Sequence, residues 1–229
     1  MPWISGSALL KIDSAIAAWV ALVAGFYLQG SVGDPWSLAL ASVIGAALVV
    51  VGFAAASRCR ELAPGGPRNR VRLALLSLAM GTAVGVANLA ANWAIAASHP
   101  ALRMLLAERM TRIGFVDAVI AAPLVEEVLV RLFLMSVMAW LVSQLTRRAE
   151  LIVPIALVGS AVVFAVLHLD RPMPADRMLA GYYRAALMGK YTMAGVALGW
   201  SFWRWGLPYS ILCHAAVNAV HLALKDRVF

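Results

Sequence analysis

The sequence APLVEEVLVRLF at residues 122–133 decides how the chain folds, because it places charged side chains inside an apolar run. The run covers about residues 115–142, which is long enough to cross a bilayer as a helix. Each central charge opposes insertion by roughly 3 kcal/mol, so Glu126, Glu127 and Arg131 together oppose it by about 9 kcal/mol before any pairing. Residues of this kind persist in a span because they pair with one another or because they carry out chemistry.

Spacing along this helix separates the two glutamates. Glu127 and Arg131 are four residues apart and share a helix face, so we expect an ion pair that organises the packing. Glu126 projects about 100° away from Glu127, off the face that Arg131 shares. A carboxylate in such an apolar setting indicates a functional site. Pro123 weakens the helix just before the pair and predicts a kink that opens a wet pocket.

Apolar runs on both sides extend the membrane interpretation to the whole chain. The 229 residues are 63% hydrophobic and only 13% charged, which is far more apolar than a soluble domain needs. The runs are too long and too unalternating for barrel strands, so we predict an all-α, polytopic transmembrane helical bundle, a single integral membrane domain over residues 1–229. About seven spans are expected, at residues 14–30, 36–57, 73–97, 115–142, 151–168, 188–203 and 207–224.

The net charge of +8 lies almost entirely in short segments between the apolar runs. This distribution is typical of loops at lipid headgroups, so the bilayer is the expected partner and nucleic acid is not. The arginine-rich loop at residues 58–72 places the N-terminus in the cytoplasm, although Lys and Arg divide nine to nine between the two sides and leave the reverse orientation open. The excess of arginine over lysine favours a bacterial inner (plasma) membrane.

Two further spans carry histidines one helical turn from a second distinctive residue. The sequence FAVLH at residues 164–168 ends the fifth span, and HAAVN at residues 214–218 occupies the middle of the seventh. Residues four apart project from one helix face. Because the fourth span runs opposite to the fifth and seventh, we expect Glu126, His168 and His214 to face a single cavity.

The ordered motifs Glu-Glu-x-x-x-Arg, Phe-x-x-x-His and His-x-x-x-Asn resemble the CPBP family, also called the Abi family, of CAAX prenyl endopeptidases and bacteriocin-processing proteases. The resemblance covers about residues 123–218 and implies a CAAX-prenyl-endopeptidase-like catalytic core at about residues 115–224. This chain departs from the common pattern at Val130 and Leu132, where an aromatic residue and a glycine are usual. The departures bear on substrate preference more than on catalysis.

The resemblance implies an intramembrane endopeptidase of the glutamic type. Glu126 would activate water with the help of His168, and both must reach the same water. His214 and Asn218 would stabilise the tetrahedral oxyanion. Glu127 and Arg131 would organise the site.

The resemblance also bears on cofactors and substrates. We expect no cofactor and no metal, because Asn218 suits an oxyanion role and is a poor zinc ligand. A zinc site built from two histidines and a glutamate is the alternative, since members of the family have been described as metalloproteases. The expected partner is a protein or peptide substrate that enters the site from the membrane.

Orientation separates the candidate functions. With a cytoplasmic N-terminus the site opens outward, which suits sorting or maturation of exported proteins by cleavage near a membrane-proximal or C-terminal segment. The reverse orientation suits a cytosol-facing CAAX-type prenyl-protein or bacteriocin-like peptide protease. A non-proteolytic proton-coupled transporter explains the buried charges equally well, but not Asn218 one turn after His214. A non-enzymatic immunity or scaffold protein is the remaining alternative.

Other polar and small residues receive structural interpretations. Asn88 and Asn92 share a helix face and predict hydrogen bonds between helices. His221 is interpreted as an interfacial histidine, and residues 170–190 as a solvated connector, with a substrate gate as the alternative. Pairs of small residues four apart predict close helix approach: Gly81 with Gly85, and Gly195 with Gly199.

Overall fold

The computed structural model describes residues 19–20, 23, 34–59, 69–111, 114–146, 148–169 and 173–228. Within these residues every regular element is a helix, which confirms the predicted all-α class. One long central helix, Asp117–Leu145, changes its hydrogen-bonding register along its length and is divided into four labelled segments. The elements are α2 (Pro35–Arg58), α3 (Arg70–Ser98), α4 (Pro100–Thr111), η2 (Asp117–Ala121), α5 (Ala122–Glu126), η3 (Glu127–Met135), α6 (Ser136–Leu145), α7 (Ala149–Leu167), α8 (Arg177–Trp205) and α9 (Leu207–Val228).

Five of the described helices are long and apolar enough to cross a membrane, which indicates an integral membrane protein. Large apolar side chains such as Val43 on α2 and Leu75 on α3 are exposed on their outer faces, as lipid contact requires. The first predicted span lies outside the described residues except for residues 19, 20 and 23. The sixth lies within α8 (Arg177–Trp205), which is not among these five. The five spans are Ala39–Arg58, Arg70–Ser98, Asp117–Leu145, Glu150–Leu167 and Leu207–Leu224.

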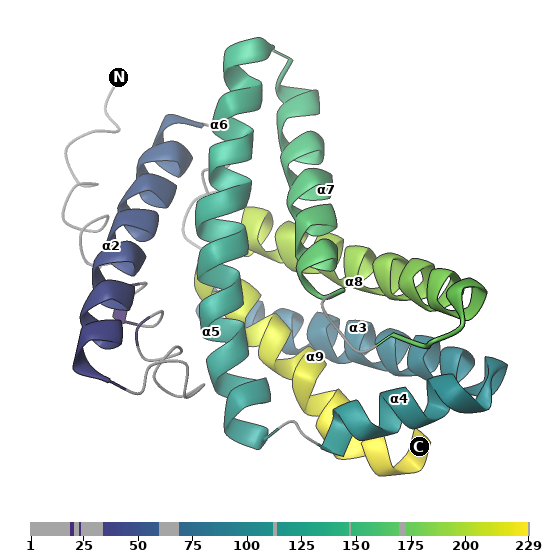
Figure 1. Ribbon diagram of the computed structural model, residues 1–229. Coiled ribbons are helices and arrows are strands. Elements are labelled where there is room, and N and C mark those ends of the chain that lie inside the picture. Colours follow the sequence, from purple (N-terminus) through teal and green to yellow (C-terminus); the bar gives the residue numbers. More distant parts are fainter. Residues whose placement is uncertain are drawn as a thin grey trace.

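The helices form two crossing groups (Figure 1). In this view α2, the central helix and α7 stand side by side, whereas α3, α8 and α9 pass across them. Contacts between α2 and α6 and between α6 and α7 hold the first group together, and α3 and α8 both pack against α9 in the second. The two groups meet where α7 packs against α8 and where α9 contacts the η2, α5 and η3 segments of the central helix.

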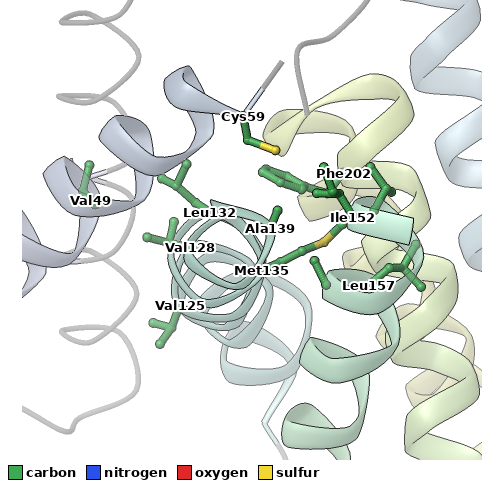
Figure 2. Packing of buried hydrophobic residues seen from close by; sticks show 12 residues of the cluster. Val49, Cys59, Val125, Val128, Leu132, Met135, Ala139, Ile152, Leu157 and Phe202 are labelled. Atoms are coloured by element: carbon green, nitrogen blue, oxygen red, sulfur yellow. The ribbon is translucent and has the colours of Figure 1, made fainter. Parts of the chain in front are cut away.

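The central helix joins its neighbours through an apolar stripe at alternating spacings of three and four residues (Figure 2). This spacing keeps the stripe on one face of the helix. In a bilayer such contacts stabilise helix association through close packing and not through exclusion of water. The stripe comprises Val125, Val128, Leu132, Met135 and Ala139, and it packs against Val49 and Cys59 of the α2 end, Ile152 and Leu157 of α7, and Phe202 of α8.

Glycines bring α3 unusually close to α9. A Cβ atom added at Gly81 would collide with the carbonyl oxygen of Cys213 and lie 2.8 Å from Cβ of Ala216. One added at Gly85 would lie 3.0 Å from the carbonyl oxygen of Val217. The close approach predicted for this pair is therefore confirmed, and it fixes the helix that carries the His-x-x-x-Asn motif.

The connector predicted over residues 170–190 is wrong from residue 177 onward, because α8 begins at Arg177. Tyr183 and Leu187 are four residues apart and buried, with exposed fractions of 2% and 0%, so this half of α8 has an apolar face that packs inward. The Asp176 carboxylate caps the helix by accepting a hydrogen bond from the backbone N–H of Leu179 at 2.7 Å. Arg177 and Arg184, two of the charged residues of this segment, lie on the exposed side of the helix.

Candidate active site

Pro123 changes the hydrogen bonding of the central helix just before the glutamate pair. The backbone N–H of Ala122 bonds to the carbonyl of Asp117, five residues earlier, which is a π-helical bond. In this register the carbonyl of Ala118 would require an N–H from residue 123, and proline has none. The side-chain Nδ2 of Asn218 supplies the missing donor at 2.7 Å. Pro123 therefore creates the acceptor that ties α9 to the central helix.

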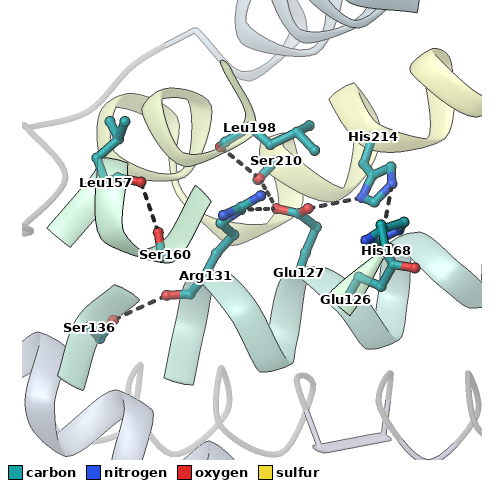
Figure 3. Close-up of polar contacts among 10 residues, drawn as sticks. All are labelled: Glu126, Glu127, Arg131, Ser136, Leu157, Ser160, His168, Leu198, Ser210 and His214. Atoms are coloured by element: carbon teal, nitrogen blue, oxygen red, sulfur yellow. Dashed lines mark hydrogen bonds and ion pairs between the residues drawn. The ribbon is translucent and has the colours of Figure 1, made fainter. Parts of the chain in front are cut away.

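Glu126 ends α5 and faces two histidines that come from different helices (Figure 3). Its Oε2 atom lies 3.7 Å from Nε2 of His168 and 3.7 Å from Nε2 of His214. Both distances exceed that of a direct hydrogen bond and suit a bridging water. Glu126, His168 and His214 come from three separate predicted spans and lie together, as we expected from the opposite directions of these spans.

Each histidine is oriented by its other ring nitrogen. Nδ1 of His168 donates to the carbonyl of Phe164 at 2.8 Å, which is one of the carbonyls left without a helical partner at the end of α7. Nδ1 of His214 donates to Oε1 of Glu127 at 2.9 Å. A backbone carbonyl and an ionised carboxylate only accept, so Nδ1 is the donor in both cases. The two Nε2 atoms are left directed at Glu126.

Glu127 is fully buried, and its carboxylate contacts residues of both the central helix and α9. Its Oε2 atom lies 3.5 Å from Nε of Arg131, so the predicted i,i+4 ion pair is present. The Ser210 hydroxyl also donates to Oε2, while His214 contacts Oε1. The Arg131 guanidinium lies 5.1 Å from the centre of the Phe164 ring, which places a cation–π contact beneath the histidine that Phe164 orients. Two helices are thereby locked in register around His214.

These side chains border a cavity of about 250 Å³. Aromatic rings form one wall: the Phe164 ring lies 4.4 Å from the His168 ring, and the Tyr191 ring lies 4.5 Å from it on the same wall. The cavity combines this apolar wall with a small number of polar groups, as binding sites commonly do. The polar residues that line it include Glu126, His168, His214, Asn218, Lys190 and His221.

The structure adds residues that sequence reasoning did not assign to the site. Nζ of Lys190 donates to Oδ1 of Asn92 at 2.8 Å, and Nδ2 of Asn92 donates to Nε2 of His221 at 3.2 Å. The interhelical hydrogen bonds predicted for Asn92 are therefore present. His221 lines the cavity, and its position near the membrane interface stays a prediction. Lys190 was assigned to the connector. With residues 177–190 assigned to a helix, Lys190 falls on the same helix face as Ala194, four residues later, which also lines the cavity.

Among the residues that the structure describes, no three His, Cys, Asp or Glu side chains are placed to hold a metal ion together. Hydrogen bonds of Nδ1 hold both histidines with Nε2 towards Glu126, an orientation that metal-binding histidines share. No step of the mechanism below is routed through a metal.

Comparison with known proteins places this geometry in a family. The family model described as type II CAAX prenyl endopeptidase Rce1-like matches residues 108–220. Residues 108–220 therefore match the CAAX protease family. The matched region contains the glutamate pair, both histidines and Asn218, and the match supports a membrane endopeptidase, a hydrolase of peptide bonds. No curated protein and no solved structure matches the chain.

Proposed function

We propose that this protein is an intramembrane endopeptidase that uses Glu126 to activate water. The observation that carries the proposal is the convergence of two histidine Nε2 atoms on one oxygen of Glu126, each at 3.7 Å, within a cavity among apolar helices. A water molecule at hydrogen-bonding distance from Glu126 and His168 fits this spacing. Such a position is what general-base catalysis requires of the attacking water.

The first step is addition of that water to the substrate carbonyl. Glu126 accepts one proton as the water oxygen forms its bond to the carbonyl carbon, and His168 holds the water through Nε2. The peptide C=O becomes an oxyanion. Glu126 then returns the proton to the amide nitrogen as the C–N bond breaks, so the products are one carboxylic acid and one amine, and the enzyme is regenerated.

The oxyanion requires hydrogen-bond donors. The Asn218 amide carries two N–H groups, one of which donates to the carbonyl of Ala118, and the second is the donor that we assign to the oxyanion. Nε2–H of His214 is the other, with Glu127 orienting the ring through Nδ1. Removing one such donor from an active site typically lowers the catalytic rate by about 10²–10³-fold.

The surroundings favour a substrate segment that reaches the cavity from the bilayer. Exposed apolar side chains cover the outer faces of the spans, which suits a protein or peptide substrate that is itself held in the bilayer. We propose that residues 1–229 form one membrane domain, with the catalytic core at about residues 115–224, in a bacterial inner membrane. Sorting or maturation of exported proteins fits an outward-facing site, and cleavage of prenylated proteins or bacteriocin-like peptides fits a cytosolic one.

Mass spectrometry of protein termini tests this proposal. Membrane and secreted fractions are compared between cells that carry the wild-type protein and cells that carry Glu126→Gln at equal abundance. Glu150→Gln is the matched control, since Glu150 is an exposed carboxylate at the start of α7 and does not line the cavity. We expect new termini with the wild type and the control only, and their location will show which membrane face the site serves.

The same comparison can contradict the proposal. Identical termini in all three strains would favour the transporter or scaffold alternatives. A transporter would lose proton coupling in Glu126→Gln without any change in cleaved products, and a scaffold would keep its function in that variant.

A further inference from the structure

Asn88 is a buried polar residue in the wall of the catalytic cavity. It belongs to α3, it is only 4% exposed, and it lines the same cavity as Glu126. Within the part of the chain that the structure describes, its side-chain amide makes no hydrogen bond, so the interhelical bond predicted for Asn88 is not formed there. Polar side chains inside a membrane protein are costly and mark functional sites. The amide of Asn88 is therefore available to a molecule in the cavity.

The next asparagine on this face of α3 shows the contrast. Asn92 lies one helical turn after Asn88 and uses both ends of its amide within the protein. Its Oδ1 atom accepts a hydrogen bond from Nζ of Lys190 at 2.8 Å, and its Nδ2 atom donates to Nε2 of His221 at 3.2 Å. Asn92 thus joins α3 to α8 and α9, whereas Asn88 lines the cavity.

Packing on both sides places Asn88 beside Asn218, the proposed oxyanion donor. A Cβ atom added at Gly85 would lie 3.0 Å from the carbonyl oxygen of the residue before Asn218. Asn92 bonds to His221, three residues after Asn218. Asn88 lies between Gly85 and Asn92 on the same face of α3, which places it beside the turn of α9 that contains Asn218. Both asparagines line the cavity.

A primary amide is complementary to the main chain of an extended peptide. The asparagine side chain carries two N–H donors and one carbonyl acceptor. The N–H and C=O of one extended residue point to the same side of the chain, as in a hydrogen-bonded pair of antiparallel strands, so a single amide can bind both. An extended segment has no internal hydrogen bonds and lipid supplies none, so a cavity that receives such a segment must provide partners.

We propose that Asn88 binds the main chain of the substrate through the N–H and C=O of one extended residue close to the bond that is cut. This inference rests on the proposed function, because it assigns a substrate contact to the cavity of Glu126. With the oxyanion held at Asn218, a neighbouring residue held at Asn88 fixes which peptide bond reaches Glu126. Main-chain groups are common to all residues except proline, so this contact does not depend on substrate side chains.

Peptide binding to the full-length protein in lipid nanodiscs tests the proposal. The Glu126→Gln background is used so that the probes are not cleaved. The parent probe is acetyl-Ala-Ala-Val-Leu-Ala-Ala amide, which carries no charge. The other probes replace one backbone amide with an ester, at each position in turn, which removes one N–H donor and weakens one acceptor. We expect isothermal titration to find an ester position that weakens binding about tenfold, as the loss of a buried hydrogen bond typically does.

Variants assign this effect to Asn88. Asn88→Leu should weaken binding of the parent probe about tenfold and abolish the difference between the parent and that ester, because the contact is already lost. Thr82→Val is the matched control, since it removes a hydrogen-bonding group from the exposed side of the same helix and should change nothing. If Asn88→Leu does not fold, Asn88→Ala provides the same comparison.

The outcomes separate this proposal from the protease proposal. Unchanged binding in Asn88→Leu, an ester effect that survives this substitution, or no binding of any probe would each overturn the main-chain site. Cleavage in cells that depends on Glu126 would then still support proteolysis. Binding that depends on Asn88, together with unchanged protein termini in cells, would retain the main-chain site and refute proteolysis.

Discussion

Glu127 and His214 are joined by a hydrogen bond of 2.9 Å between Oε1 and Nδ1 that crosses from the central helix to α9. The opposite ring nitrogen of His214 lies 3.7 Å from Glu126, so adjacent glutamates approach the two nitrogens of one imidazole. The two carboxylates therefore occupy different positions: Glu127 is fully buried and paired with Arg131, whereas Glu126 faces the cavity.

Replacing Glu127 should affect both stability and activity. Glu127→Gln leaves the buried Arg131 charge uncompensated, which typically destabilises a protein by about 3–5 kcal/mol. The double variant Glu127→Gln/Arg131→Met removes both charges and should recover most of that stability, as measured by thermal unfolding of the purified protein. It should remain less active than the wild type, because the carboxylate that orients His214 is gone. If the double variant is as unstable as the single one, the ion pair is not the source of the stability.

Asn218 is predicted to combine a structural role with a catalytic one. Asn218→Ala removes the donor for the Ala118 carbonyl, with an expected loss of about 1–3 kcal/mol of stability, and it removes an oxyanion donor, with an expected rate loss of about 10²–10³-fold. Adding Pro123→Ala supplies a backbone N–H to that carbonyl. The double variant should recover stability in thermal unfolding while its kcat stays low. Recovery of kcat together with stability would show that Asn218 acts only on the structure.

A side chain at Gly81 should destabilise the protein, because α3 and α9 pack closely there. Gly81→Val places a Cβ against the carbonyl of Cys213, which is backbone and cannot move aside, so the helices must separate. Overpacking of this kind costs about 1–3 kcal/mol, and displacement of α9 should also lower activity. Gly189→Ala is the matched control, since a Cβ there meets nothing within 4 Å and alanine favours a helix. Equal melting temperatures for Gly81→Val and the wild type would contradict the packing seen here.

Metal removal should leave activity unchanged. We expect treatment with EDTA or 1,10-phenanthroline to have no effect on cleavage of a substrate identified from the protein termini, because Asn218 suits an oxyanion role and is a poor zinc ligand. The purified protein should also contain no stoichiometric zinc by elemental analysis. Inhibition by the chelator that is reversed by added zinc would replace the glutamate mechanism with a metal-assisted one.

Local patterns in the sequence were sufficient for the class of protein and for part of the site. Hydropathy over about 20 residues predicts helical spans because every backbone polar group in lipid must be paired within its own segment. The i,i+4 spacing of Glu127 and Arg131 predicts their ion pair because both residues lie on one helix, where the geometry is fixed locally. Motif order on separate spans was enough to place Glu126, His168 and His214 at one cavity. Their catalytic roles remain predictions.

Only the tertiary structure decided the contacts between helices. The meeting of Asn218 with the carbonyl of Ala118 depends on how α9 crosses the central helix, and the meeting of Lys190 with Asn92 depends on how α8 crosses α3. No periodicity encodes these crossings, because they follow from close packing at positions such as Gly81. Helix periodicity fixes which face a residue occupies, whereas packing between helices fixes which residue that face meets.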